Sequence, residues 1–309
     1  MAQKAIDAPA ETLQLAVAAV TDAAGREENQ DIAAALVLGS EAGDANAQNF
    51  LLVVADGMGG HPAGDVASRI ALDTLTEAFP ALPQGDLGQA LTQAYRQAND
   101  AIFAAGEAEP THAGMGTTLT SALLHGKYAT VAHVGDSRAY LLRGDGITQV
   151  TRDHTVVSDE VAQGRLSADA ARTDSRRNML THAIGTNAKL DRNLPSIFEL
   201  TLLPDDRLML CSDGLYEVLD DPDLRRALSG QDPGAAAQML VALAKERGTR
   251  DNASAVVAAA IPTRIPVAGT VPIPEERTGG VPGFAIAAVV AMLLIVLLVL
   301  ALFVLGTPR

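Results

Sequence analysis

Short, mostly apolar runs recur through the body of the chain, and Gly, Asp or Asn residues bound many of them. Their length and composition predict β-strands. The runs are Leu13–Val20, Ile32–Leu38, Phe50–Ala55, Thr117–Leu124, Tyr128–Val134, Ala139–Arg143, Ile197–Leu203, Arg207–Cys211 and Ala253–Ala260. Apolar positions at helical spacing predict helices over Ala63–Phe79, Leu87–Ala105 and Ala235–Arg247. Because strands and helices come in groups, we expect an α+β fold in which helices cover antiparallel sheets.

Residues 153–193 interrupt this pattern, because they are polar and rich in arginine. We expect an inserted helical subdomain here, which we call the flap. The body over residues 13–261 has the length of one large domain. We expect residues 1–12, which precede it, to form a flexible N-terminus.

The C-terminal region contains an unbroken apolar stretch. Phe284–Leu305 has 22 residues with no charge, proline or glycine. As a helix it would span about 33 Å, enough for a hydrocarbon core of about 30 Å. A buried helix of a soluble protein normally has a polar face, and this stretch has none. The sequence therefore predicts a transmembrane helix over residues 284–305, and the Pro- and Gly-rich residues 262–283 predict an extended linker.

The N-terminal residues lack the basic and then apolar pattern of a signal peptide. We therefore expect the predicted helix to act as a single-pass C-terminal anchor in the inner membrane, with the body on the cytoplasmic face.

The chain carries 23 Lys and Arg against 37 Asp and Glu, a net charge of −14. This charge repels nucleic-acid phosphates, so no nucleic-acid partner is expected. With Cys211 as its one cysteine, the chain forms no internal disulfide and no Cys-rich zinc site.

Aspartates follow or precede several of the predicted strands. Asp56, Asp136 and Asp213 each stand next to a glycine at a strand end, and Asp251 stands just before the last strand. One Asp-Gly pair is most often a turn. Several strand ends that converge would instead gather oxygen ligands of the kind that hard divalent cations prefer, and cations would offset the repulsion between the carboxylates. The pattern alone leaves both interpretations open, turns or a two-cation hydrolase.

The sequence motifs around these aspartates are more specific than the aspartates alone. They are GREENQD (25–31), VADGMGGHPAGDVAS (54–68), GMGTTLT (114–120), VGDSRAYLLRGDGI (134–147), SDGLYEVL (212–219) and TRDNASAVV (249–257). In this order and spacing the chain resembles the bacterial form of the PPM/PP2C family of metal-dependent serine/threonine protein phosphatases over residues 13–261. The resemblance implies a central antiparallel β-sandwich with helices on both outer faces.

The resemblance also implies a set of metal ligands. Asp56 would bridge two Mn²⁺ or Mg²⁺ ions, and the carbonyl group of Gly57 would bind one of them. Asp213 and Asp251 would bind the other ion. A water shared by two cations has a strongly lowered pKa, so a hydroxide nucleophile is expected near neutral pH.

Further roles are implied for residues around the ions. Asp136 would bind a third, weaker ion, and Asp31 would hold metal-bound waters from a second shell. Arg26 would clamp the substrate phosphate, because its planar guanidinium matches two phosphate oxygens. His61 would protonate the leaving serine or threonine oxygen. Gln30 stands where some family members carry a glutamate that contacts metal-bound water. An amide keeps this hydrogen bond but lacks the negative charge of the glutamate.

We therefore expect metal-dependent hydrolysis of phosphoserine and phosphothreonine in proteins, by an enzyme tethered to the membrane that opposes a serine/threonine kinase. One alternative is a pseudophosphatase, a phosphoprotein-binding scaffold with the same fold. Another is a phosphatase with the same metal centre that acts on a single regulatory phosphoprotein. The Arg176–Arg177 pair is typical of a solvated flap surface, with docking of acidic phosphorylated substrates as the alternative.

Overall fold

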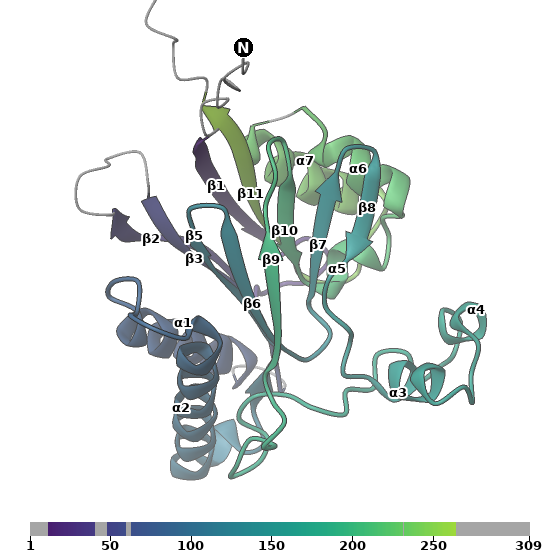
Figure 1. The fold of residues 1–309 in the computed structure, drawn as a ribbon. Helices are drawn as coiled ribbons and strands as arrows, with labels where there is room; N and C mark the ends of the chain where they lie inside the picture. Colours follow the sequence, from purple (N-terminus) through teal and green to yellow (C-terminus); the bar gives the residue numbers. More distant parts are fainter. Residues whose placement is uncertain (1–11, 41–47, 60–62, 231, 264–309) are drawn as a thin grey trace, which may run out of the picture. The chain divides into compact units, whose positions relative to one another are not determined.

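The computed structural model describes residues 12–40, 48–59, 63–230 and 232–263. In these ranges the strands form two antiparallel sheets (Figure 1). The strands are β1 (Thr12–Asp22), β2 (Asp31–Ser40), β3 (Gln48–Met58), β4 (Gly116–Thr117), β5 (Leu119–His125), β6 (Tyr128–Val134), β7 (Arg138–Arg143), β8 (Gly146–Gln149), β9 (Ser196–Thr201), β10 (Arg207–Cys211) and β11 (Ala253–Thr263). One sheet has the order β1-β11-β10-β7-β8, and the other has β2-β3-β5-β6-β9, with β4 paired to β3.

Helices cover the outer faces of both sheets. The helices of the described residues are α1 (Ala63–Ala78), α2 (Leu87–Ala108), α3 (Val156–Ala162), α4 (Ala168–Ala171), α5 (Asp213–Tyr216), α6 (Asp221–Leu228) and α7 (Pro233–Glu246), with a 3₁₀ turn, η1, over Pro110–His112. Helices α1 and α2 lie against the sheet that contains β3, and α6 and α7 lie against the sheet that contains β10 (Figure 1). The domain thus has helix, sheet, sheet and helix layers, which confirms the expected α+β architecture.

Strand β3 shows why its sequence is apolar without interruption. Leu51 and Val53 point to the layer shared with α1 and α2, whereas Leu52 and Val54 point into the layer between the sheets. All four side chains are fully buried. A strand covered on both faces needs apolar residues at every position rather than at alternate ones.

The sequence pattern did not predict β8, α6 or the very short α5 and η1. Strand β8 lies at the edge of its sheet and is mostly exposed, so its few polar residues give no apolar run. Helix α6 has only eight residues and buries one short stripe. Its start is nevertheless recorded in the sequence, because the side chain of Asp220 caps the helix by accepting a hydrogen bond from the backbone N–H of Asp223, and a proline follows in the first turn.

The flap contains the short helices α3 and α4, and irregular backbone makes up most of the rest. It is therefore less helical than expected.

Several predicted features lie outside the described residues: His61, residues 1–11 of the N-terminus, residues 264–283 of the linker and the candidate transmembrane segment 284–305. Thr12, Pro262 and Thr263 belong to β1 and β11 rather than to flanking segments. Across the described ranges, no helix is both long and apolar enough to cross a membrane.

Candidate active site

The layer between the two sheets changes from apolar to polar at one end. Side chains two positions apart on a strand lie on the same face, so the row of Leu52 and Val54 continues into Asp56. Asp31 is the register partner of Asp56 on β2. From the other sheet, the Ser212 hydroxyl donates a hydrogen bond of 2.6 Å to Oδ2 of Asp31. The sheets are therefore joined by a buried polar contact where the apolar layer ends.

The predicted carboxylates gather at this end, and we call Asp31, Asp56, Asp136, Asp213 and Asp251 the carboxylate cluster. Burial, and next the charge of Asp31, raises the pKa of Asp56 well above its ordinary value. Burial, and next the charge of Asp136, does the same to the pKa of Asp213. Burial also raises the pKa of Asp31 to about 6 and that of Asp136 to about 7. The folded chain thus holds like charges together in a poorly solvated place, which cations would relieve.

Asp213 carries a buried oxygen that a bound cation would satisfy. It is the first residue of α5 and follows directly on β10 and Ser212. Its Oδ1 atom is buried and has no hydrogen-bond partner among the residues that the structure describes. An unpaired buried carboxylate oxygen is costly, and metal coordination is one of the few arrangements that satisfies it.

The backbone around Asp56 is held tightly. Its N–H donates to Oγ1 of Thr118, and its carbonyl accepts from the N–H of Thr118. At the next position, a Cβ on Gly57 would lie 1.9 Å from the carbonyl oxygen of Gly64. Only glycine therefore allows β3 to pass this close to the start of α1.

Arg26 lies at the edge of the cluster. Its Nη2 donates to Oδ2 of Asp251 over 2.6 Å, and its Nε donates to the carbonyl of Arg250 over 3.1 Å. The hydrogen bond to Asp251 raises the pKa of Arg26. About half of the side chain is exposed, at 54%. The predicted phosphate clamp is therefore accessible, and it is paired with a predicted metal ligand.

A second group of contacts fixes Asp136. The Tyr216 hydroxyl donates to the Asp136 carbonyl over 3.0 Å. The guanidinium carbon of Arg138 lies 3.5 Å from the centre of the Tyr216 ring, and Nε and Nη2 of Arg138 donate to the carboxylate of Asp153. Tyr216 and Arg138 thus connect the turn at Asp136, the helix α5 and the first residue of the flap.

These supporting residues were missed from the sequence. Besides Ser212, Tyr216 and Arg138, they include Ser254, whose N–H donates to Oγ of Ser212. His133 is likewise buried, with its ring nitrogens bonded to Thr120 and the Arg152 carbonyl, and burial lowers its pKa to about 3. One signal was available: serines at positions 212 and 254 continue apolar rows by two residues, where a further apolar residue would be expected.

The donor set fits hard divalent cations. Carboxylate oxygens are the ligands that Mg²⁺ and Mn²⁺ favour, usually one or two per ion with waters completing the shell. Within the described ranges, no group of three or more His, Cys, Asp or Glu side chains is placed so that it could hold an ion by itself. The unpaired oxygen of Asp213 and the raised carboxylate pKa values are therefore the observations that support cation binding at this cluster.

Cys211 is buried as expected, and burial raises its pKa to about 12, which excludes a reactive thiolate at neutral pH.

Sequence comparisons extend this picture. The family model described as protein phosphatase 2C matches residues 19–253. The serine/threonine protein phosphatase PstP of Mycobacterium tuberculosis is 39% identical over 208 residues, which cover 67% of this chain and 40% of PstP. The serine/threonine phosphatase stp of Listeria innocua is 34% identical over 207 residues, covering 65% of this chain and 81% of stp. The chain thus spans less than half the length of PstP and most of the length of stp.

Solved structures of phosphatases are similar to this chain over most of its length. The crystal structure of the Mycobacterium tuberculosis phosphatase PstP/Ppp superposes with a TM-score of 0.71 at 36% identity, covering 81% of this chain and 99% of that one. The catalytic domain of PstP in complex with two manganese ions gives a TM-score of 0.69 at 36% identity, covering 81% and 100%. The family match runs from within β1 to the first residue of β11 and includes every member of the carboxylate cluster. This chain belongs to the protein phosphatase 2C family.

Proposed function

We propose that this chain hydrolyses phosphoserine and phosphothreonine in proteins and that the reaction depends on divalent cations. The observation that carries the proposal is the buried carboxylate cluster, with the accessible Arg26 at its edge. In this cluster, Oδ1 of Asp213 has no partner within the described part of the chain. Relatives named as serine/threonine phosphatases, one of them solved with two manganese ions, support it.

Asp56, Asp213 and Asp251, with the Gly57 carbonyl, are the groups that would hold two Mn²⁺ or Mg²⁺ ions, and Asp136 would hold a third. Bound cations supply Lewis acidity and activate water near neutral pH. Asp31 would hold metal-bound waters rather than bind an ion directly. The Ser212 hydroxyl orients its carboxylate for this role.

Arg26 binds the substrate phosphate in this proposal. It can do so without a large movement, because its side chain already reaches the cluster and leaves guanidinium N–H groups that are not bonded to Asp251. A planar fork fits two phosphate oxygens and orients the phosphorus. We assign protonation of the leaving oxygen to His61 on the sequence pattern DGMGGH.

We also propose that residues 284–305 span the inner membrane and that residues 262–283 tether the domain on its cytoplasmic face. The support is the uncharged 22-residue stretch in the sequence. Such a tether raises the effective concentration of the enzyme near membrane-bound phosphoproteins and near a serine/threonine kinase that it opposes. Carbonate-resistant membrane association of the full chain, lost on deletion of 284–305, is the expected result. Release of the full chain into the soluble fraction would contradict the tether.

The test of the enzyme proposal is phosphate release from phosphothreonine and phosphotyrosine peptides by the full chain in detergent. We expect release with Mn²⁺ that favours phosphothreonine and that disappears with EDTA or in the Asp56→Asn variant. A folded, Mn²⁺-loaded protein that binds phosphopeptides tightly without releasing phosphate would instead be a phosphoprotein-binding scaffold.

A further inference from the structure

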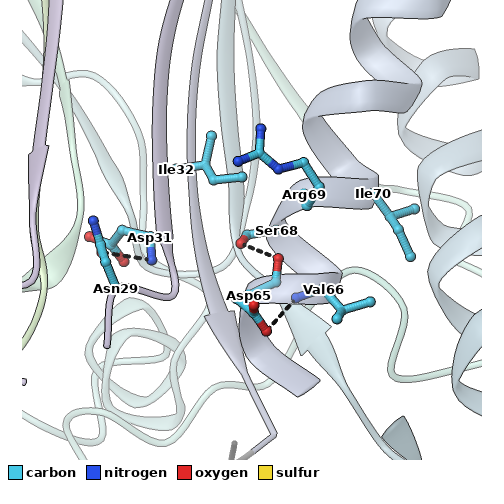
Figure 2. A pocket seen from close by; sticks show the side chains of 8 residues that line it. All are labelled: Asn29, Asp31, Ile32, Asp65, Val66, Ser68, Arg69 and Ile70. Atoms are coloured by element: carbon cyan, nitrogen blue, oxygen red, sulfur yellow. Dashed lines mark hydrogen bonds between the residues drawn. The ribbon is translucent and has the colours of Figure 1, made fainter. Parts of the chain in front are cut away.

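A cavity of about 310 Å³ lies between strand β2 and the first turns of helix α1 (Figure 2). Its lining residues are Asn29, Asp31, Ile32, Asp65, Val66, Ser68, Arg69 and Ile70. Asp31 belongs to both places, because it is a member of the carboxylate cluster and also a wall of this cavity. A phosphoprotein whose phosphate is bound at the cluster therefore has this cavity beside it.

The cavity suits a segment of polypeptide in size and lining. Ile32, Val66 and Ile70 give it apolar walls that are only partly buried. Its neutral polar residues are already engaged, since the Asn29 side chain bonds to Thr21 and to its own loop, and Ser68 donates to backbone carbonyls. Strand β2 is also at the edge of its sheet, so no other described strand of that sheet lies beyond it.

Charge distinguishes one lining residue from the rest. Arg69 is exposed, and its side chain has no hydrogen-bond or ion-pair partner in the part of the chain that the structure describes. Figure 2 shows its side chain reaching from α1 toward Ile32 of β2. By contrast, the carboxylate of Asp31 is buried and bonded by Ser212, and that of Asp65 accepts from the N–H of Val66 in the first turn of α1, where the helix dipole favours a negative charge.

The arginines that the sequence suggested for docking acidic substrates are differently placed. Arg176 is paired with Asp174 and Glu160. Arg177 lies 3.8 Å from the carboxylate of Glu217. Both are therefore paired with or close to carboxylates of the domain, whereas the Arg69 side chain forms no ion pair with any described residue.

We propose that this cavity is a subsite for the polypeptide flanking the phosphorylated residue, and that Arg69 selects a carboxylate side chain there. The inference rests on the proposed function and names a substrate preference of the same site. In a domain with a net charge of −14, an acidic peptide is otherwise repelled, so one unpaired guanidinium beside the reaction centre has a clear effect on which sequences bind. Because Asp31 belongs both to the cluster and to the cavity, we expect the carboxylate close to the phosphothreonine in the peptide sequence, and an extended peptide advances about 3.3 Å per residue.

The experiment uses the full chain with Mn²⁺ and a set of phosphothreonine peptides in a neutral Ala/Gly background. Each peptide carries one glutamate, at a position from three before to three after the phosphothreonine. We expect glutamate at one or two adjacent positions to lower KM by about two- to fivefold, the effect of a solvent-exposed ion pair. Arg69→Glu removes or reverses this preference, and Arg69→Lys keeps part of it. Hydrolysis of p-nitrophenyl phosphate, which has no flanking residues, is unchanged.

Arg96→Glu is the matched control. Arg96 is exposed on α2 and does not line the cavity, so the variant has the same net charge as Arg69→Glu and keeps the preference. If no glutamate position changes KM, or if the preference survives in Arg69→Glu, the subsite is wrong while the phosphatase activity stands. If the unmodified, Mn²⁺-loaded chain releases no phosphate from any peptide, the proposed function fails and the subsite fails with it.

Discussion

Arg26 and Asp251 form an ion pair of 2.6 Å at the edge of the carboxylate cluster. The residue proposed to bind phosphate is thus held by a residue proposed to bind a cation. A cation on Asp251 would compete for the same oxygen and would weaken the hold on the guanidinium. Metal binding and release of Arg26 toward the phosphate are therefore coupled through one carboxylate.

This pair leads to a prediction for Arg26. Arg26→Ala removes charged hydrogen bonds to phosphate, each of which contributes about 1.5–3 kcal/mol, so kcat/KM for a phosphothreonine peptide falls by about tenfold or more. Arg26→Lys recovers only part of the loss, because an ammonium group is not a planar fork. Steady-state kinetics at saturating Mn²⁺ measures both values. Unchanged kcat/KM in Arg26→Ala would remove the phosphate role.

Asp213 offers a test with opposite signs in two conditions. Without metal, Asp213→Asn relieves repulsion in the cluster and raises the melting temperature. With Mn²⁺ at about a hundred times its Kd, the unmodified chain gains about 5–10 °C, and the variant gains much less. Thermal unfolding in EDTA and in Mn²⁺ checks both. A variant that is less stable than the unmodified chain in EDTA would show that repulsion at Asp213 does not dominate.

The stability of the metal-free domain should depend on pH through Asp136. Its pKa is raised to about 7 in the folded chain by burial, so between pH 4 and 7 the folded state binds more protons than the unfolded state. Stability contributed by this group therefore falls as pH rises through that range and levels off above it, with a slope of up to about 1.4 kcal/mol per pH unit. Urea unfolding in EDTA from pH 4.5 to 8 measures the slope. Asp136→Asn should make the slope shallower without removing it, because the pKa values of the neighbouring Asp31, Asp56 and Asp213 are also raised. An equal slope in the variant would assign the dependence to those neighbours.

Tyr216 should tune metal binding without touching a metal. Tyr216→Phe keeps the ring under Arg138 but removes the hydrogen bond to the Asp136 carbonyl, so we expect Mn²⁺ affinity to weaken by about three- to tenfold. Calorimetric titration measures it. Tyr140→Phe is the control, because the Tyr140 hydroxyl accepts from Arg138 and forms no hydrogen bond to Asp136. Equal losses in both variants would point to Arg138 rather than to Asp136.

The main elements could be predicted because apolar burial leaves a strong trace in the sequence. The unbroken run that forms β3 and the helical spacing that forms α1 are consequences of the layers that cover them. Elements at the periphery leave less trace: β8 is an exposed edge, and α6 buries a single narrow stripe. Their positions are set by neighbours that are remote in the sequence.

The same distinction holds for the site. Asp56 and Asp213 could be proposed from the sequence because strands that end on aspartate and glycine recur here, and because the motifs around them resemble those of a known family. Ser212 and Tyr216 could not, since a serine or a tyrosine near a strand end is common. Their importance comes from partners in the fold: Ser212 bonds Asp31 of the opposite sheet, and Tyr216 bonds the turn after β6.

The abrupt end of the apolar layer at the carboxylate cluster has a consequence for the protein in a living cell. A chain that unfolds lets these acidic groups separate into water, whereas the folded chain keeps them crowded unless cations are present. Manganese scarcity would then enlarge the fraction of molecules open to proteolysis, in addition to slowing each surviving molecule. Dephosphorylation would respond to the metal supply twice, through the turnover of each copy and through the number of copies that persist.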